Sequence, residues 1–495
     1  MTLDSAKVAA QDPRTRRAND KVTSTWSESN RFVPRRVVRP LQAFTEIEAS
    51  SGIVMLIAAV VALVWANSPF GDGYRDLLHT QINISVGDLI HLDLNLEQWV
   101  NDGLMVIFFF VVGLEIKREL VLGELRDPKS AALPAAAAIG GMVVPALIFV
   151  YFNAGEPSAD GWGIPMATDI AFAVGVVALV GNRISVAAKL FLLALAIVDD
   201  LGAIAVIAIF YTESLALGWL GAAVAAFVLT YVLNRLRVRA LAVYVVLGLF
   251  AWLAMHESGV HATITGVIMG FLTPARPFYN PQRFRDAAAP LLDRIGQGYD
   301  RGDTGYSHES GDSAVHDLQI LAHETLSPLD RIEHKLHLWS SFAIIPLFAL
   351  ANAGVEVTGE MVSGALSEPV VLGIVFGLVI GKTFGILGAT YIAVRSGLGR
   401  LPRHTTWRDI TGLAMAGGIG FTVALFVANL AFAQGATSGS LVEGEVPLID
   451  YAKAGILLGS LIAGLLSYAF LRSSAPLPPG ADARIEPPEI ESTAR

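Results

Sequence analysis

Residues 190–210 read LFLLALAIVDDLGAIAVIAIF, and this stretch decides the fold class. A helix that crosses a bilayer needs about 20 mostly apolar residues, and this run has that length. Asp199 and Asp200 stand at its middle, between apolar residues on both sides. An ionisable group at the centre of a bilayer costs several kcal/mol, so each carboxylate inside a span is a functional candidate. The stretch therefore predicts a transmembrane helix built around two acidic residues.

The composition of the whole chain also favours a membrane protein. Its 495 residues are 53% hydrophobic and only 16% charged, whereas soluble proteins carry about a quarter charged residues. The chain has no cysteine, which excludes disulfides, zinc–thiolate sites, iron–sulfur clusters and thiol catalysis. We expect no cofactor, no enzymatic activity and no nucleic-acid partner.

Apolar runs like the first one recur along the chain, and they predict an all-α membrane protein with about twelve transmembrane helices. The candidate spans are 51–67, 98–118, 131–153, 164–181, 184–211, 215–233, 239–255, 259–273, 337–354, 370–395, 409–433 and 452–471. Loops rich in Lys and Arg alternate with loops that hold mainly Asp and Glu. Because basic loops concentrate in the cytoplasm, the alternation predicts that both termini are cytoplasmic.

Polar segments flank and interrupt the predicted membrane domain, 41–472. The Arg-rich head, 1–40, is expected to be a disordered cytoplasmic arm, and the Pro-rich end, 473–495, a disordered cytoplasmic tail. Residues 80–95 alternate around a Gly-Asp turn and predict an extracellular β-hairpin. The polar, acidic and glycine-bearing segment 278–330 is expected to be a flexible cytoplasmic insertion.

Four ionisable residues lie inside predicted spans: Asp169, Asp199, Asp200 and Lys382. Neighbouring residues on an α-helix point about 100° apart, so Asp199 and Asp200 cannot share one face. Lys382 lies in GIVFGLVIGKTFGILGATYIA, too far from either end to reach an interface. A carboxylate neighbour would keep its ammonium group charged, so we expect Lys382 to pair with one of the two aspartates.

Two predicted spans are interrupted. In the fourth, Pro165 removes a backbone donor, and a break after it would expose Thr168 and Asp169 as oxygen ligands for Na⁺ or Li⁺; a capping role for Asp169 is the alternative. The eleventh span is interrupted by three glycines: Gly417, Gly418 and Gly420. Interruptions in corresponding positions of two halves indicate inverted-topology repeats whose unwound helices cross at an ion site. We expect Asp169 to balance the N-terminal half-helix ends and Lys382 the C-terminal ends.

A charged cluster, GLEIKREL, ends the second span. Glu115 and Glu119 are four residues apart and share a face, and Arg118 can pair with either. Interfacial anchoring and a pH-responsive cluster at a cytoplasmic funnel both fit this pattern. His256 and His261 flank the eighth span and titrate in the appropriate range, although a structural role is the alternative.

Seven motifs together resemble the NhaA family of sodium/proton antiporters in order and spacing, over roughly residues 40–472. They are VNDGLMVIFFFVVGLEIKREL, MATDIAFA, LAIVDDLGAIAVIA, GVHATITGVIMGF, PLFALANAGV, IGKTFGI and GGIGFTVALFVANLAF. The resemblance implies a twelve-helix fold whose fourth and eleventh helices are unwound and cross. By motif matching, Asp200, Asp169 and Thr168 correspond to the ion-binding group, and Asp199 to the carboxylate paired with Lys382.

The resemblance also implies an activity. The family exports Na⁺ or Li⁺ in exchange for protons, electrogenically, and serves sodium and pH homeostasis in the bacterial plasma (inner) membrane. Its members are activated at alkaline pH and form homodimers, partly through an extracellular hairpin. The positions that match those associated with the pH response are Glu115, Arg118, Glu119 and His261.

Two close carboxylates in a poorly solvated cavity cannot both ionise easily, so protons and Na⁺ are expected to compete for the same oxygens. An intramembrane aspartyl protease would need a GxGD motif, and a prenyltransferase DDxxD; the spans lack both. A cation/proton exchanger with another ion preference, or a sodium-coupled symporter of similar architecture, remains the alternative. The sequence does not distinguish among Na⁺, Li⁺ and K⁺.

Overall fold

The structure is a computed structural model, and it describes residues 50–86, 90–181, 183–212, 215–236, 238, 240–277, 279, 281–300, 306–365, 367–432 and 447–474. By its internal contacts the chain divides into Met1–Ser50 and Ser51–Arg495, and all described residues except Ser50 belong to the second unit. The expected arm (1–40), the expected tail beyond Ser474 and the Gly-Asp turn of the expected hairpin lie outside the described residues.

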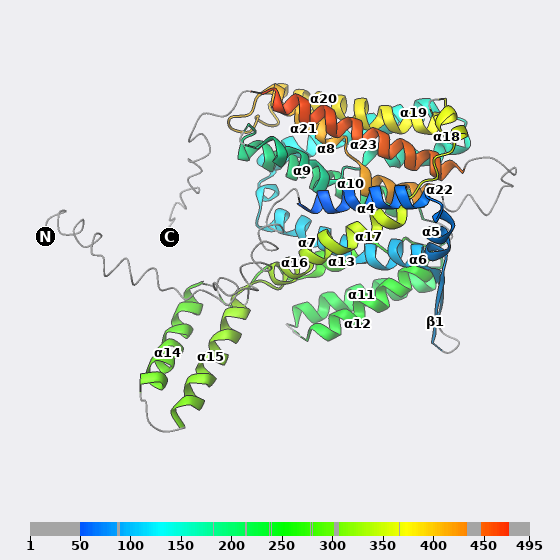
Figure 1. Cartoon of the computed structure of the whole chain (residues 1–495). Helices are drawn as coiled ribbons and strands as arrows, with labels where there is room; N and C mark the ends of the chain where they lie inside the picture. Colours follow the sequence, from blue (N-terminus) through cyan, green and yellow to red (C-terminus); the bar gives the residue numbers. More distant parts are fainter. Residues whose placement is uncertain are drawn as a thin grey trace, which may run out of the picture. The chain divides into compact units, whose positions relative to one another are not determined.

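The described residues are mostly helical (Figure 1). In chain order the elements, with η for a 3-10 or π turn, are α4 (Ser50–Ala66), α5 (Gly71–Leu78), β1 (Gln81–Val86), β2 (Ile90–Asn95), α6 (Leu96–Gln98), η3 (Trp99–Leu104), α7 (Met105–Val121), η4 (Glu124–Arg126), α8 (Pro128–Asn153), η5 (Pro157–Met166), α9 (Ile170–Val180), α10 (Val186–Phe210), α11 (Leu217–Arg235), α12 (Leu241–Glu257), α13 (Ile264–Leu272), α14 (Pro281–Asp300), α15 (Tyr306–Thr325), α16 (Pro328–Trp339), η6 (Ser340–Ile344), α17 (Ile345–Asn352), α18 (Gly359–Ala365), α19 (Pro369–Phe376), η7 (Gly377–Gly381), α20 (Lys382–Arg395), α21 (Trp407–Gly417), α22 (Phe421–Phe432) and α23 (Leu448–Arg472).

Several of these helices are long and apolar enough to cross a membrane. Five qualify as single helices: α8, α10, α11, the continuous run α19–η7–α20, and α23. Three further pairs qualify if each bent pair is one span: α4 with α5 (115°), η5 with α9 (45°), and α21 with α22 (41°). By length and composition, the described residues thus hold five to eight possible spans. The count of twelve stays a prediction.

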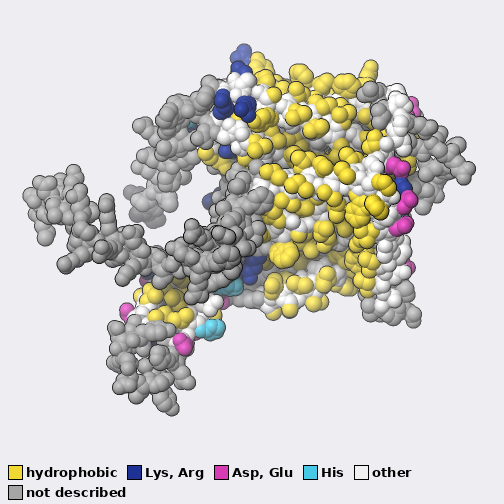
Figure 2. Space-filling model, viewed as in Figure 1, with side chains coloured by type: hydrophobic (Ala, Val, Ile, Leu, Met, Phe, Trp, Pro, Cys, Tyr) yellow, Lys and Arg dark blue, Asp and Glu magenta, His cyan; other side chains and the backbone are white. Residues whose placement is uncertain are grey.

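Local sequence explains where these helices begin. The Asp127 side chain accepts a hydrogen bond from the backbone at the start of α8, and Ser185 does the same for α10. Thr406 and Asp409 form a reciprocal capping box at the start of α21. Each cap satisfies a backbone N–H that has no partner inside the helix. Apolar side chains cover much of the helix surface on the face that Figure 2 shows, as expected where lipid replaces water.

Apart from the pair α14–α15, the closest helix packings fall into two groups. The site group comprises α8, η5, α9, α10, α19, η7 and α20–α23, and the flanking group comprises η3, α7, α11–α13, α16, η6 and α17. Figure 1 shows α19, α20 and α23 on one side and α11–α13 on the other. The groups meet where α10 packs on α7 and α17 packs on α22. Small residues permit close packing: a Cβ at Gly140 of α8 would clash with Gly385 of α20.

A two-stranded antiparallel hairpin lies where the alternating sequence predicted one. Strands β1 and β2 pair with Gln81 opposite Asn95 and Val86 opposite Ile90. The exposed side chains of Ile82 and Ile84 both lie on β1, and residues two apart in a strand share a face. The side of the membrane on which the hairpin lies stays a prediction.

The segment 278–330, expected to be a flexible insertion, contains two helices, α14 and α15, that pack against each other. Apolar residues at helical spacing explain α14: Phe284, Ala288, Leu291 and Ile295 follow one another at intervals of three or four. The polar run on which the expectation rested, residues 296–312, includes the last five residues of α14 and the first seven of α15. The flexibility of the segment stays a prediction.

Candidate functional site

A buried ion pair lies at the middle of α10. The Lys382 Nζ atom is 2.6 Å from the Asp199 Oδ2 atom, and both side chains are 0% exposed. The same ammonium group donates a hydrogen bond of 2.9 Å to the Thr168 hydroxyl. Removing one partner of such a pair leaves an uncompensated buried charge, so the two residues depend on each other.

Lys382 follows directly after the π turn η7, within the continuous helix from α19 to α20. Glycines at both ends of this turn allow the helix to approach its neighbours: a Cβ at Gly377 would lie 2.7 Å from Pro165, and one at Gly381 would lie 2.8 Å from Pro145. π turns occur frequently at functional sites because they locally widen the helix. Pro165 thus packs against the turn that precedes the lysine.

The two interrupted helices meet at their breaks. The non-helical residues are 167–169, between η5 and α9, and 418–420, between α21 and α22. The Thr168 hydroxyl donates to the Gly417 carbonyl (2.8 Å), and the Asp169 backbone N–H donates to the Ile419 carbonyl (2.6 Å). Gly420 allows this approach, because a Cβ there would lie only 2.9 Å from the Ala167 carbonyl. Residues at one break therefore provide hydrogen-bond partners for backbone carbonyls at the other. Such partners are required inside a bilayer, where no water can supply them.

Asp169 connects the N-terminal ends of α9 and α22. Its Oδ1 atom accepts a hydrogen bond of 3.0 Å from the Phe172 N–H, in the first turn of α9. Its Oδ2 atom accepts bonds from the Thr422 N–H (3.1 Å) and hydroxyl (2.7 Å), at the start of α22. A carboxylate in this position offsets the positive ends of two helix dipoles. The capping role considered as an alternative for Asp169 is thus present, alongside its contact with the other break.

Lys382 reaches the C-terminal end of α21 through Thr168. The threonine accepts the lysine's hydrogen bond and donates its own to Gly417, the last residue of α21. Positive charge near a helix C-terminus is favourable. The lysine therefore lies between one buried carboxylate and one helix end.

Asp200 lacks the ion pair with Lys382 that holds its neighbour Asp199. Asp200 is 5% exposed, and its Oδ1 atom is buried without a hydrogen-bond partner in the protein, as is the Asp199 Oδ1 atom. A buried polar atom without a partner is costly, so a bound proton or cation would lower the free energy of this state. The available ligands are carboxylate, hydroxyl and carbonyl oxygens, which hard cations prefer. Within the described ranges, no group of three or more His, Asp and Glu side chains could hold a metal ion.

The charged end of α7 contacts α16. Arg118 pairs with the buried Glu333, and its Nε atom is 3.8 Å from Glu119. Lys117 donates to two backbone carbonyls at the C-terminal end of α13 and so caps that helix. Glu115 is partly buried, one turn before Glu119.

His261 lies at the opposite end of α13 from this cluster, just before the helix begins. Its Nε2 atom is 3.9 Å from the Asp102 carboxylate, and its ring centre is 5.2 Å from that of Phe426. His256 stacks on Trp252. The four residues matched to the pH response therefore do not form one cluster: three share the end of α7, and His261 is separated from them by the length of α13.

Two residues of the site were not predicted from the sequence. Thr422 lies inside the quoted motif GGIGFTVALFVANLAF, and a hydroxyl residue next to a glycine-rich break was the available signal. Glu333 lies on α16, between the segment 278–330 and the predicted span 337–354, where no functional residue was expected. An acidic residue on a helix that leads into a span was its only signal.

The apolar helices and the buried charged site define a multi-pass membrane protein with an ionisable site among its helices. The sequence model of the family described as Na⁺/H⁺ antiporter 1 matches residues 42–471. The chain is 46% identical over 438 residues to "Na(+)/H(+) antiporter NhaA" of Oleidesulfovibrio alaskensis, covering 88% of this chain and 94% of that one. It is 44% identical to "Na(+)/H(+) antiporter NhaA 2" of Sorangium cellulosum (90% and 92%) and 45% identical to "Na(+)/H(+) antiporter NhaA" of Anaeromyxobacter sp. (92% and 94%). The chain belongs to the NhaA family of Na⁺/H⁺ antiporters.

Proposed function

We propose that this protein is a secondary antiporter that exports Na⁺ (or Li⁺) in exchange for protons. One observation carries the proposal: Asp200 has a buried carboxylate oxygen without a partner, next to Asp199, whose charge is already balanced by Lys382. The names of the relatives at 44–46% identity support the same pair of substrates.

In this proposal Asp200 binds the transported cation or proton. Asp169 and Thr168, at the break beside α10, supply further oxygen ligands. Both carboxylate oxygens of Asp169 accept hydrogen bonds, one from α9 and the other from α22. Asp169 therefore also fixes the starts of these two helices relative to each other. Lys382 keeps Asp199 neutralised and the end of α21 satisfied. Because a proton and a Na⁺ ion occupy the same oxygen, they compete, and either one neutralises the site for reorientation.

The exchange is proposed to be electrogenic. Both Asp199 and Asp200 have a carboxylate oxygen without a partner, so the proton-loaded state can carry protons on two groups. A single Na⁺ at Asp200 would leave the Asp199–Lys382 pair intact. The charges moved in the two directions would then differ.

The proposed topology is twelve spans in a bacterial plasma (inner) membrane, with inverted repeats, crossing fourth and eleventh helices, and both termini in the cytoplasm. The bends of 45° and 41° in the two interrupted helices support the repeat, as do the hydrogen bonds between their breaks. Figure 2 shows Lys and Arg gathered at one edge of the apolar surface and Asp and Glu at the opposite edge. A basic cytoplasmic edge is the arrangement that membrane insertion favours.

A homodimer that forms partly through the hairpin is also proposed. Ile82 and Ile84 are 40% and 45% exposed on the same strand, and an exposed strand with apolar side chains is suited to pairing with a second copy. The hairpin would lie on the extracellular side.

The pH response is proposed to involve Glu115, Arg118, Glu119 and His261, together with Glu333. Burial raises the pKa of Glu333, while Arg118 acts in the opposite direction. Glu333 would therefore ionise at a higher pH than an exposed glutamate, and its full attraction to Arg118 would be established as the pH rises. This direction agrees with activation at alkaline pH.

The proposal is tested by substituting Asp200 with Asn in everted membrane vesicles that hold a pH gradient reported by a fluorescent dye. Addition of Na⁺ should release the dye quenching in the wild type and not in Asp200→Asn. Asp160→Asn, in the same chain but on the first turn of η5 at an exposed position, is the matched control and should behave as wild type. Full exchange by Asp200→Asn would refute the proposal.

A further inference from the structure

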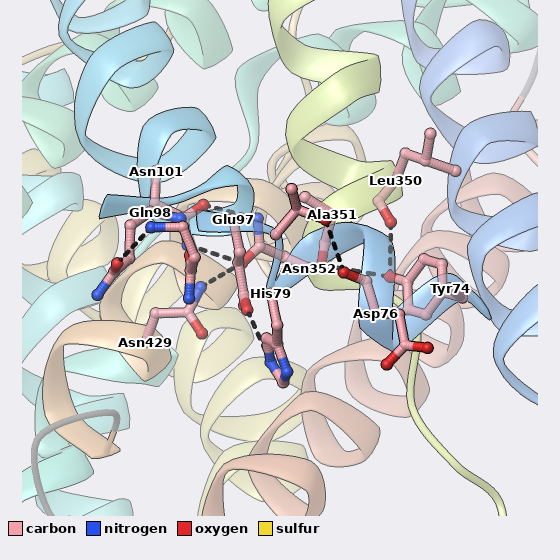
Figure 3. A network of polar contacts seen from close by, with 12 residues as sticks. Tyr74, Asp76, His79, Glu97, Gln98, Asn101, Leu350, Ala351, Asn352 and Asn429 are labelled. Carbon is pink, nitrogen blue, oxygen red and sulfur yellow. Dashed lines mark hydrogen bonds and ion pairs between the residues drawn. The ribbon is translucent and has the colours of Figure 1, made fainter. Parts of the chain in front are cut away.

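Three asparagines from three helices form a hydrogen-bonded cluster (Figure 3). Asn101 and Asn352 exchange two bonds: Asn101 Nδ2 donates to Asn352 Oδ1 (3.1 Å), and Asn352 Nδ2 donates to Asn101 Oδ1 (2.8 Å). Asn429 Nδ2 donates to the same Asn352 Oδ1 atom. Asn352 is 0% exposed and Asn429 is 8% exposed. Buried amides of this kind are stable only while they are paired.

The cluster spans the boundary between the two helix groups. Asn101 lies in the π turn η3 and Asn352 is the last residue of α17, both in the flanking group. Asn429 lies in α22, in the site group. The Asn101–Asn352 pair is thus internal to one group, whereas the Asn352–Asn429 bond joins the two.

The cluster lies directly above the proposed ion site along α22. Thr422, Phe426 and Asn429 are spaced by four and three residues, which places them on one face of the helix. The rise from Thr422 to Asn429 is about 10 Å at 1.5 Å per residue. Between the two levels, the ring of Phe426 lies 5.3 Å from that of Phe109 and 6.3 Å from that of Phe348. An apolar layer and then a polar layer therefore separate Asp169, the partner of Thr422, from that end of α22.

The end of α17 is also held from its other side. The Tyr74 hydroxyl, on α5, hydrogen-bonds to the carbonyls of Leu350 (2.7 Å) and Ala351 (3.2 Å), as Figure 3 shows. Asn352 is thus held within the flanking group by Asn101, and Tyr74 of α5, which belongs to neither group, holds the end of α17 from the other side. A relative movement of the groups at this end would consequently break the bond to Asn429 rather than the pair with Asn101.

We propose that the Asn352–Asn429 hydrogen bond is a latch that closes the external side of the ion site, and that it must break for the site to open outward. The proposal rests on the proposed function and its topology, in which the C-terminal end of α22 faces outward. Apolar contacts alone can loosen gradually, because they are not directional. A buried amide is either hydrogen-bonded to its partner or hydrated. The Asn352–Asn429 bond therefore distinguishes a closed state, in which it is formed, from an open state, in which water replaces it. The three asparagines are positioning residues, since none of them contacts the ion-binding carboxylates.

A cross-linking experiment tests the latch, and the chain is suited to it because it contains no cysteine. The variant Asn352→Cys/Asn429→Cys is treated with a short bis-methanethiosulfonate reagent, which joins the two groups through a reducible bridge. We expect Na⁺/H⁺ exchange in vesicles to fall by roughly tenfold or more on bridging and to recover when the bridge is reduced, because the closed state can no longer open.

The control joins residues within one group. Asn101→Cys/Asn352→Cys bridges the pair that stays together, so exchange should be the same before and after bridging. Unchanged exchange in fully bridged Asn352→Cys/Asn429→Cys, or equal inhibition of both pairs, would overturn the latch. Exchange that is absent from the untreated wild type would instead refute the proposed function.

A second measurement does not depend on the bridged pair. Met105→Cys places a reporter one turn after Asn101, at a buried position. Adding the substitution Asn429→Leu removes the amide group that donates the latch hydrogen bond. It leaves both hydrogen bonds of the Asn101–Asn352 pair in place. Modification of the reporter by an impermeant thiol reagent from outside should then accelerate by roughly tenfold, the effect of losing about one hydrogen bond's free energy. Asn153→Leu, at another buried asparagine, is the matched control. An equal rate in the Asn429→Leu and control backgrounds would overturn the proposal.

Discussion

The Asp199–Lys382 pair makes a quantitative prediction about stability. Lys382→Met keeps a long apolar stem and removes the ammonium group, so Asp199 loses its ion pair with Lys382 at a position that is 0% exposed. Breaking a buried pair in this way costs about 3–5 kcal/mol. The double variant Asp199→Leu/Lys382→Met removes both charges. It should recover most of that loss, because replacing a whole buried pair by apolar residues is often neutral or stabilising.

A small deficit should remain in the double variant. The Thr168 hydroxyl loses the 2.9 Å bond from Lys382, and one such bond contributes about 0.5–1.5 kcal/mol. In the single variant, Asp199 can be neutralised by taking up a proton in the folded state, whereas the unfolded state releases that proton near neutral pH. The folded state then binds more protons than the unfolded state, so stability falls as pH rises, by at most about 1.36 kcal/mol per pH unit.

The relative stability of the wild type and the two variants is tested by thermal melting of the purified proteins in detergent between pH 6 and pH 8. Wild type should melt highest, the double variant slightly lower, and Lys382→Met lowest, with a gap that widens toward pH 8. Lys189→Met, on the partly exposed first turn of α10, should change the free energy of unfolding by about 0.5 kcal/mol or less. A single variant as stable as wild type at pH 8, or a double variant no better than the single, would refute the reasoning.

Three further predictions concern the breaks and the charged cluster. Gly418→Ala should abolish exchange and lower the melting temperature, because its Cβ would clash with a backbone carbonyl of the π turn η7; Gly388→Ala, where nothing lies within 4 Å, is the control. Thr422→Val should raise the KM for Na⁺ by roughly tenfold in vesicle assays, since Asp169 loses a 2.7 Å hydrogen bond. Glu333→Gln should flatten the pH profile of exchange, because a buried carboxyl whose pKa is raised no longer titrates.

Each of these has a contradicting result. Equal exchange and melting in the two glycine variants would show that the close approach at the break is not required. An unchanged KM for Thr422→Val would exclude a role for the hydroxyl in holding Asp169. An unaltered pH profile for Glu333→Gln would remove this glutamate from the pH response.

The sequence was most informative where a charged residue lies within an apolar run. Asp199, Asp200 and Lys382 could be recognised because each interrupts an apolar run, and the energetic cost of a buried charge demands a partner. Helix geometry could not show which aspartate pairs with the lysine. It shows only that Asp199 and Asp200 point to different faces of α10. The answer depends on how α20 packs against α10, and the motif resemblance supplied the assignment that the 2.6 Å distance matches.

Other features depend on tertiary structure and had weaker signals. The π turns η3, η6 and η7 have no recognisable sequence pattern, although one of them precedes Lys382. Thr422 and Glu333 are ordinary residues in sequence, and their importance arises only from the helices they contact. The helices α14 and α15 were missed because glycines and acidic residues near their junction obscured an apolar spacing that lies mainly in α14.

Competition between Na⁺ and protons at Asp200 is the central claim, and calorimetric Na⁺ binding to the purified protein across pH tests it most directly. The Kd for Na⁺ should rise as pH falls, approaching roughly tenfold per pH unit once a single competing proton occupies the site. Asp200→Asn should show no Na⁺ binding. A Kd that does not change with pH in the wild type, or normal Na⁺ binding by Asp200→Asn, would contradict the claim.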